Sequence, residues 1–268
     1  DMGASPDQFP GYQKLSAPGV LEKFEKAWGT KLNPKEGTKA TECFGKMLTK
    51  EIRGLFIFGE DPVRTDPDTA HVMKALKNLD FLVMDELFLT ETAKMADVVL
   101  PGRSYAEKEG TFSNTERRVQ RIRKAVEIEG ETKEDIWIFT EIMNRMGYPQ
   151  PHLTSAQVMD EVASVTPSFA GISHERLDSE EVAGNGLQWP CTSKDHPGTP
   201  IMHVGKFSRG LGYCNPIEYI PSMELPDEEY PFKMMTGRVL YHYNACAMTD
   251  KTEGLNKISR HTFIEIHT

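Results

Sequence analysis

Three short apolar runs, each separated from the next by a segment of helical character, organise the first part of the chain. They cover residues 55–58, 81–83 and 98–100. A strand–helix–strand–helix–strand order is typical of a parallel α/β sheet. The first run ends at Gly59 and continues into the polar turn GEDPVRTDPD, at a position where such sheets bind nucleotides. The pattern therefore predicts a Rossmann-like parallel sheet with flanking helices.

Helical periodicity surrounds this predicted sheet on both sides along the chain. A helix is expected before Gly29, which acts as a stop, and Asp66 or Asp68 is expected to cap the helix that runs to residue 79. Thr90 is expected to cap a short helix before Asp97. Further helices are predicted over residues 40–52, 135–148 and 155–165, the last capped at Thr154.

The texture changes after residue 101. The alternating VQRIRKAV predicts a strand, and residues 171–231 are mostly irregular before a β pattern resumes at PFKMMTGRVLYHY. The final FIEIHT also alternates as a strand does. A basic cluster precedes and enters the first of these strands, and it indicates either a solvated face or a contact with an anionic cofactor or partner. Its members are Arg117, Arg118, Arg121, Arg123 and Lys124.

Composition narrows the functional classes. The 268 residues are 38% hydrophobic and carry a formal net charge of −9, which argues against a nucleic-acid surface as the main function. Apolar runs stay far below the roughly 20 residues of a membrane span. The four cysteines are widely spaced without a CxxC pattern, so a local zinc or iron–sulfur motif is not indicated and thiols in a reducing cytoplasm are expected.

Candidate chemistry from the residues alone is concentrated in the GEDPVRTD turn. Gly59 allows the backbone to approach a ligand closely, and Asp61 and Thr65 offer polar groups to a guanine edge or a ribose. The alternative is a plain strand–helix connection, because the turn is neither GxGxxG nor a P-loop. Asp85 at the end of the second strand suits contact with a ribose hydroxyl; the alternatives are a helix cap or a surface carboxylate.

Arg238, His242 and Asn244 form a second candidate group in TGRVLYHYN. A lone histidine is more often a structural residue than a ligand, and its neighbours Arg238 and Asn244 add some weight to a binding role. Neither a Ser-His-Asp arrangement nor an HExxH motif is present in the sequence.

Several long motifs carry a family resemblance that runs over nearly the whole chain. They include FIFGEDPVRTDPD, MADVVLPGRSYAEKEGTFSNTERRVQRIRKAVE and DEEYPFKMMTGRVLYHYN. With these motifs the chain resembles the large, catalytic subunit of molybdopterin-dependent formate dehydrogenases, in the dimethyl sulfoxide reductase superfamily. The resemblance implies a bis(molybdopterin guanine dinucleotide) cofactor with molybdenum or tungsten, and a parent enzyme that interconverts formate and carbon dioxide by two-electron transfer.

The resemblance also implies cofactor-binding residues. Gly59, Asp61 and Thr65 would bind the guanosine diphosphate half of one pterin dinucleotide, with Gly102 and Asp135 near the same cofactor. Arg238, His242 and Asn244 would contact the pterin dinucleotide from a C-terminal β domain. Two departures weaken the match: Met84 stands where the family commonly has Gln before Asp85, and ACAMT follows YHYN in place of a threonine-and-glycine version.

On this resemblance the chain is expected to be a middle segment of its parent. Residues 1–104 would be part of the α/β cofactor-binding domain, 105–197 a connecting α+β region, and 198–268 the truncated start of a β-barrel-like domain. Catalytic residues, the metal ligand and the cysteines of the parent's 4Fe-4S cluster are expected outside this chain, which alone would be inactive. Iron–sulfur or flavin electron-transfer subunits are the implied partners, in the cytoplasm.

Two other readings stay open. The chain could be a separate, non-catalytic cofactor-binding or scaffold subunit that completes a site with another polypeptide. It could also belong to another molybdopterin oxidoreductase, such as a nitrate reductase or a formylmethanofuran dehydrogenase.

Overall fold

The computed structural model describes residues 5–128, 130–207, 210–260 and 263–266. The chain divides into two compact units, Asp1–Met202 and His203–Thr268, and each is described by itself. The first unit contains the predicted parallel sheet, two smaller antiparallel sheets and most of the helices. The predicted assignment of 1–104, 105–197 and 198–268 to three functional parts stays a prediction.

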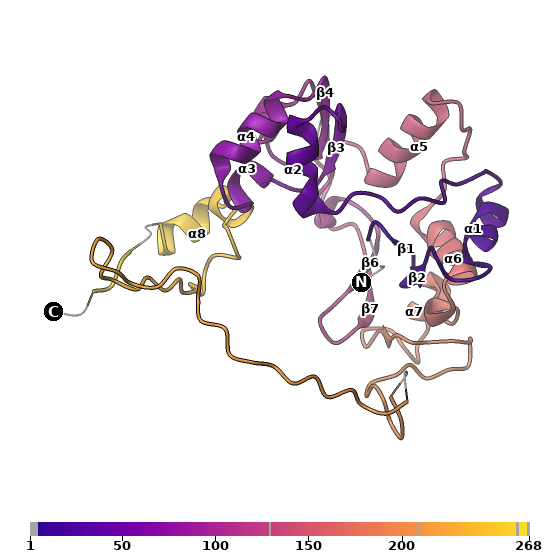
Figure 1. Cartoon of the computed structure of the whole chain (residues 1–268). Coiled ribbons are helices and arrows are strands. Elements are labelled where there is room, and N and C mark those ends of the chain that lie inside the picture. Colours follow the sequence, from indigo (N-terminus) through magenta and orange to yellow (C-terminus); the bar gives the residue numbers. More distant parts are fainter. Residues whose placement is uncertain (1–4, 129, 208–209, 261–262, 267–268) are drawn as a thin grey trace. The chain divides into compact units, whose positions relative to one another are not determined.

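The parallel sheet has three strands in the order β3-β4-β5 (Figure 1). The strands are β3 (Gly54–Phe58), β4 (Phe81–Glu86) and β5 (Val98–Pro101). Phe58 is paired with Asp85, and Asp85 with Leu100. The three carboxyl ends therefore meet at one edge of the sheet, as the strand–helix pattern predicts.

Helices cover both faces of this sheet (Figure 1). One side carries α2 (Ala40–Leu48), α3 (Pro62–Thr65) and α4 (Thr69–Lys77). On the other side Phe139 of α5 (Asp135–Arg145) packs against Phe56 and Phe58, with ring centroids 5.6 and 5.3 Å apart. A buried apolar core joins the first group of helices to the sheet; it includes Met47, Ile57, Val72, Leu76, Leu82 and Met84.

The helix boundaries agree with the expected caps in two places and differ in one. Asp68 caps α4 by accepting a hydrogen bond from the His71 N–H at 3.1 Å. Thr90 accepts from the Ala93 N–H, also at 3.1 Å, at the start of the 3₁₀ helix η1 (Ala93–Met95). The helix predicted over 40–52 ends earlier, at Leu48, because Lys50 has the left-handed φ of 63°, a conformation that cannot continue a right-handed helix.

A second group of elements packs around aromatic side chains. Short strands β1 (Gln8–Phe9) and β2 (Gln13–Lys14) lead into α1 (Val20–Trp28), which contacts α6 (Ser155–Val165). Phe24 is fully buried and stacks on Phe9, with centroids 4.5 Å apart. Thr154 caps α6 as the sequence predicts.

The third sheet forms the region after the parallel sheet. It has the order β6-β7-β8, and its core includes Val119, Ile172, Leu177, Leu187 and Cys191. Its elements and their neighbours are η2 (Tyr105–Glu107), β6 (Gly110–Ser113), β7 (Arg118–Ile122), η3 (Pro167–Phe169), α7 (His174–Leu177) and β8 (Leu187–Gln188). Residues 171–231 are expected to be irregular. The first half of this stretch contains little regular structure, but its apolar side chains pack in this core.

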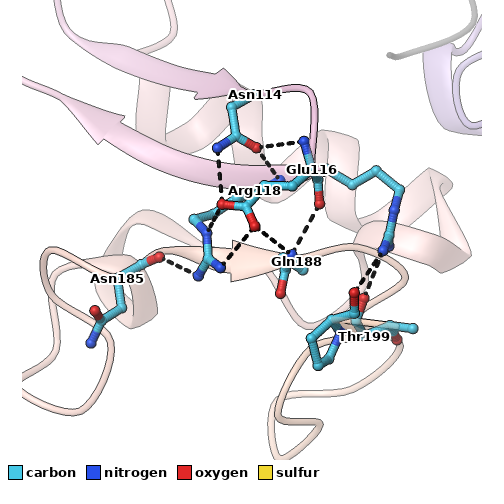
Figure 2. Close-up of polar contacts among 8 residues, drawn as sticks. Asn114, Glu116, Arg118, Asn185, Gln188 and Thr199 are labelled. Carbon is cyan, nitrogen blue, oxygen red and sulfur yellow. Dashed lines mark hydrogen bonds and ion pairs between the residues drawn. The ribbon is translucent and has the colours of Figure 1, made fainter. Parts of the chain in front are cut away.

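A polar network holds the tip of the β6–β7 hairpin against β8 and the segment around it. The Glu116 carboxylate accepts from the Arg118 Nε at 2.6 Å and from Gln188 at 3.2 Å, and Arg118 donates to the Asn185 carbonyl (Figure 2). The Arg118 guanidinium lowers the pKa of Glu116 to about 2. Arg117 donates to the carbonyl of Thr199 at 3.0 Å.

The basic cluster thus acts inside the fold. Arg121 and Arg123 both pair with the Asp178 carboxylate, at 3.1 and 2.6 Å, and Lys124 pairs with Glu127. Arg123 and Lys124 are exposed, as the solvated-face alternative predicts, while Arg117 and Arg118 also bind loop carbonyls and Arg121 binds the acidic end of α7. A contact with an anionic cofactor or partner stays a prediction.

The second unit differs from the expected β pattern. Its described residues include η4 (Thr249–Lys251) and α8 (Glu253–Ile258) but no strand, so neither PFKMMTGRVLYHY nor residues 263–266 of the final run form one. The last two positions of that run lie outside the described residues. A strand needs a neighbouring strand for its backbone groups, and the apolar side chains of Phe232, Met234 and Met235 are exposed here.

Two glycines next to β8 offer a matched test of this packing. Gly184 and Gly186 both have left-handed φ, 80° and 67°. A Cβ on Gly184 would meet nothing within 4 Å, whereas on Gly186 it would lie 2.5 Å from the Val119 carbonyl oxygen. Gly184→Ala should cost about 1 kcal/mol for the conformation alone, and Gly186→Ala about 1–3 kcal/mol more for the clash with β7.

Urea unfolding of the two variants would measure this difference. Equal losses in the free energy of unfolding would show that the β7–β8 approach is not as close as described.

Candidate functional site

Acidic side chains gather at the carboxyl edge of the parallel sheet. Asp61 follows β3, and Asp85 and Glu86 end β4; their exposed fractions are 5%, 2% and 8%. Asp135 opens α5, which follows the β6–β7 hairpin along the chain. Gly102 directly follows β5 and donates its N–H to the Glu86 carbonyl at 3.2 Å. The structure therefore brings Gly59, Asp61, Thr65, Asp85, Gly102 and Asp135 to one edge of the sheet.

The GEDPVRTD turn is largely closed on itself. The Asp61 Oδ1 accepts from both the N–H and the hydroxyl of Thr92, at 3.1 and 2.5 Å, and the Thr65 hydroxyl donates to the Asp61 carbonyl at 3.1 Å. The Gly59 N–H donates to the Asp85 carbonyl at 2.9 Å. Asp61 thus ties the turn after β3 to the loop after β4, a structural task that the sequence does not indicate.

Gly59 has the open backbone that the sequence predicts for it. Its φ is 62°, and a Cβ built on it would meet nothing within 4 Å. The space where a side chain would lie at Gly59 is therefore open, although the amide itself is already bonded.

Asp85 and Asp135 flank Gly102. A Cβ on Gly102 would lie 2.6 Å from the Asp85 Oδ1 and 3.5 Å from the Asp135 Oδ1, so only glycine leaves room between the two carboxylates. The Asp85 Oδ2 is buried without a hydrogen-bond partner among the described residues. A buried, unpaired acceptor is costly, and such groups in native proteins call for an explanation.

The acidic surroundings change how Asp85 titrates. Burial, and secondly the charge of Asp135, raise the pKa of Asp85 to about 6, against the opposing effect of Lys108. Burial likewise raises the pKa of Glu86. The edge of the sheet is thus an acceptor-rich site in which the negative charge is held at a cost.

Lys108 provides a cation at this cluster of carboxylates. Its Nζ bonds the Asp135 Oδ2, and both side chains are mostly buried, with 25% and 22% of their surfaces exposed. The sequence offers no signal for Lys108 or for Thr92, since both lie in motifs whose pattern indicates only a turn.

A separate cleft lies beside the start of α5. It has a volume of about 320 Å³ and is lined by Arg103, Lys133, Glu134, Ile136, Trp137, His152 and Leu153. Its polar side chains already have partners: Arg103 pairs with Glu134 at 3.6 Å, and the Lys133 ammonium lies over the Trp137 ring.

The remaining candidates lie in the second unit. Arg238 is exposed. His242 bonds the Thr249 hydroxyl through Nδ1 at 3.1 Å and the Ser259 carbonyl through Nε2, and Asn244 has a left-handed φ of 47°. His242 thus stabilises its own unit, as a lone structural histidine does.

Neither a metal-binding cluster nor a membrane helix occurs in the part of the chain that the structure describes. Within it, His, Cys, Asp and Glu side chains nowhere gather in threes so as to hold a metal ion. Its helices are too short or too polar to cross a bilayer.

Comparison with known proteins identifies the family of this chain. The F420-dependent formate dehydrogenase subunit alpha of Methanocaldococcus jannaschii is 45% identical over 271 residues, covering 100% of this chain and 39% of that protein. The F420-dependent formate dehydrogenase 2 subunit alpha of Methanococcus maripaludis is 46% identical over 273 residues, with the same coverage. The chain therefore spans about two fifths of the length of these relatives.

Among solved structures, acetylene hydratase from Pelobacter acetylenicus is similar at a TM-score of 0.44 and 23% identity, over 59% of this chain and 22% of that one. A likeness at that level does not establish a shared arrangement. The family model described as molybdopterin oxidoreductase matches residues 9–145, which include the whole parallel sheet and the acidic residues at its edge. By that match and by the two relatives, the chain belongs to the molybdopterin oxidoreductase family.

Proposed function

We propose that this chain is a segment of a formate dehydrogenase catalytic subunit, and that its sheet edge binds the guanosine end of a bis(molybdopterin guanine dinucleotide) cofactor. The names of the relatives support the enzyme class, and the family supports a molybdopterin cofactor. The parent enzyme would interconvert formate and carbon dioxide. The bound cofactor, with molybdenum or tungsten, supplies the two-electron chemistry.

The unpaired Asp85 Oδ2 carries this proposal. An ionised carboxylate only accepts hydrogen bonds, so the group that satisfies it must donate. Guanine presents N–H donors on its Watson–Crick edge, and ribose presents hydroxyls, whereas a phosphate presents acceptors and negative charge. An edge that holds Asp85, Glu86 and Asp135 therefore suits the guanosine and not the pyrophosphate.

The other residues then take distinct roles. Gly102 leaves the space between two carboxylates, and Gly59 leaves open backbone beside it. Asp61 and Thr65 act by holding the turn after β3 against Thr92. Arg238, His242 and Asn244 stay proposed contacts from the second unit.

In this proposal, the metal ligand and the 4Fe-4S cluster of the parent lie in parts of the relatives to which this chain does not align. Electron-transfer subunits and a cytoplasmic location belong to the same proposal. The alternatives are a separate scaffold subunit, or a segment of a nitrate reductase or a formylmethanofuran dehydrogenase. The names of the two relatives favour formate dehydrogenase.

Binding of GDP to the 268-residue chain tests the site directly. Isothermal titration calorimetry at pH 7.5 should show GDP binding at least about tenfold more tightly than ADP, because adenine lacks the N1–H and the 2-amino group that a carboxylate would accept. Asp85→Asn should weaken GDP binding by about tenfold. Asp80→Asn is the matched control, because Asp80 precedes the same strand at its opposite end and pairs with Lys50 and Arg53. Equal affinity for the two nucleotides would refute guanosine recognition here.

Asp85 should also make the ligand-free chain less stable at neutral pH. Its pKa is raised from 3.8 to about 6 by burial and by Asp135, so the folded state holds its proton more tightly than the unfolded state. Stability from this group is complete below pH 4 and is lost as the pH rises to about 6. Asp85→Asn should therefore add about 1–3 kcal/mol to the free energy of unfolding at pH 7.5, and little at pH 4.

Urea unfolding at pH 7.5 and pH 4 would measure the change in the free energy of unfolding. Lys50 and Arg53 lower the pKa of Asp80, so Asp80→Asn should not stabilise the chain at pH 7.5. A loss of stability in Asp85→Asn would mean that its carboxylate has a stabilising partner.

A further inference from the structure

Lys108 is held in place by the backbone on both sides of it. Before it, Ser104 and Glu107 form a reciprocal capping box around η2, in which the Ser104 N–H donates to the Glu107 Oε2 at 2.9 Å. After it, β6 begins at Gly110 and pairs with β7. The lysine side chain therefore reaches Asp135 from a fixed turn, and the bond joins the segment before the hairpin to the first residue of α5.

The carboxylates around Gly102 need a cation if both are to stay ionised. The Oδ1 atoms of Asp85 and Asp135 both lie close to the Cα of Gly102, Glu86 lies next to Asp85 on β4, and Lys108 is the charge that opposes them. Two acidic groups at close range disfavour each other's ionisation, and a protonated carboxyl offers an O–H donor where a guanosine donor needs an acceptor.

We propose that Lys108 is a positioning residue for the nucleotide: it holds the Asp135 carboxylate by its Oδ2 and offsets its charge, so that Asp85 and Asp135 both present acceptors next to Gly102. This inference rests on the proposed function. Lys108 bonds one oxygen of Asp135 and leaves the Oδ1 on the side of Gly102. As a compact point charge, an ammonium can occupy one oxygen in this way.

The pH dependence of GDP binding separates this role from a merely structural one. Binding needs an ionised Asp85, so GDP affinity should fall as the pH drops through about 6 in the unaltered chain. Lys108→Met removes the charge that lowers the pKa of Asp85, so the midpoint should move up by about one pH unit, and GDP affinity at pH 6.5 should fall about threefold. Titration of the GDP phosphate is common to all variants and cancels in the comparison.

Three variants complete the experiment, by calorimetry from pH 5 to pH 8. Lys108→Arg keeps the charge and should restore the midpoint. Lys108→Gln can keep a hydrogen bond to Asp135 without the charge, so it should shift the midpoint as Lys108→Met does; it also serves if circular dichroism shows Lys108→Met to be unfolded. Lys46→Met is the matched control, since Lys46 pairs with Glu42 on the surface of α2, and it should leave the profile unchanged.

The outcomes distinguish the two proposals. If the unaltered chain does not prefer GDP to ADP, the proposed function fails. If it does, but Lys108→Met and Lys108→Gln keep the unaltered midpoint, the positioning role is wrong. A loss of affinity that is equal at every pH would also overturn it, because that is the behaviour of a residue that only supports the fold.

Discussion

The pairing of β3, β4 and β5 in parallel is the constraint on which the rest of this chain depends. Parallel strands end on the same edge, and the register sets Asp85 beside Phe58 on one side and Leu100 on the other. The carboxylate is thereby buried at this edge, and its Oδ2 stays without a hydrogen-bond partner in the described residues. In the proposed function, a donor of the guanosine removes the cost of this unpaired acceptor.

The other polar side chains around that edge have hydrogen-bond partners within the chain, whereas the Asp85 Oδ2 has none among the described residues. Asp61 binds Thr92, Thr65 binds the Asp61 carbonyl, and Lys108 binds Asp135. Because these groups are internally paired, the turns keep their shape without a ligand. Under the proposed function, stability favours a neutral residue at position 85 and binding favours the ionised Asp85, a trade-off common at functional sites.

In the hairpin of β6 and β7, the role of the basic residues depends on the groups they contact. Arg118 binds the Asn185 carbonyl beside β8 (Figure 2). Arg117 binds the Thr199 carbonyl, and Arg121 and Arg123 share Asp178. This arrangement fixes the region that follows Lys108. The cations of this hairpin bind carbonyls and carboxylates within the first unit.

Local pattern alone determined the parallel sheet, most helices and several caps, because apolar periodicity and residues such as Asp68 and Thr154 act over a few positions. The motifs also indicated the family and the candidate residues Gly59, Asp61, Asp85, Gly102 and Asp135. Only the tertiary structure showed that Asp61 serves the loop, that Lys108 reaches Asp135, and that PFKMMTGRVLYHY does not form a strand here. Those outcomes depend on which distant groups meet, and a linear pattern carries the preferences of a segment but not the identity of its partners.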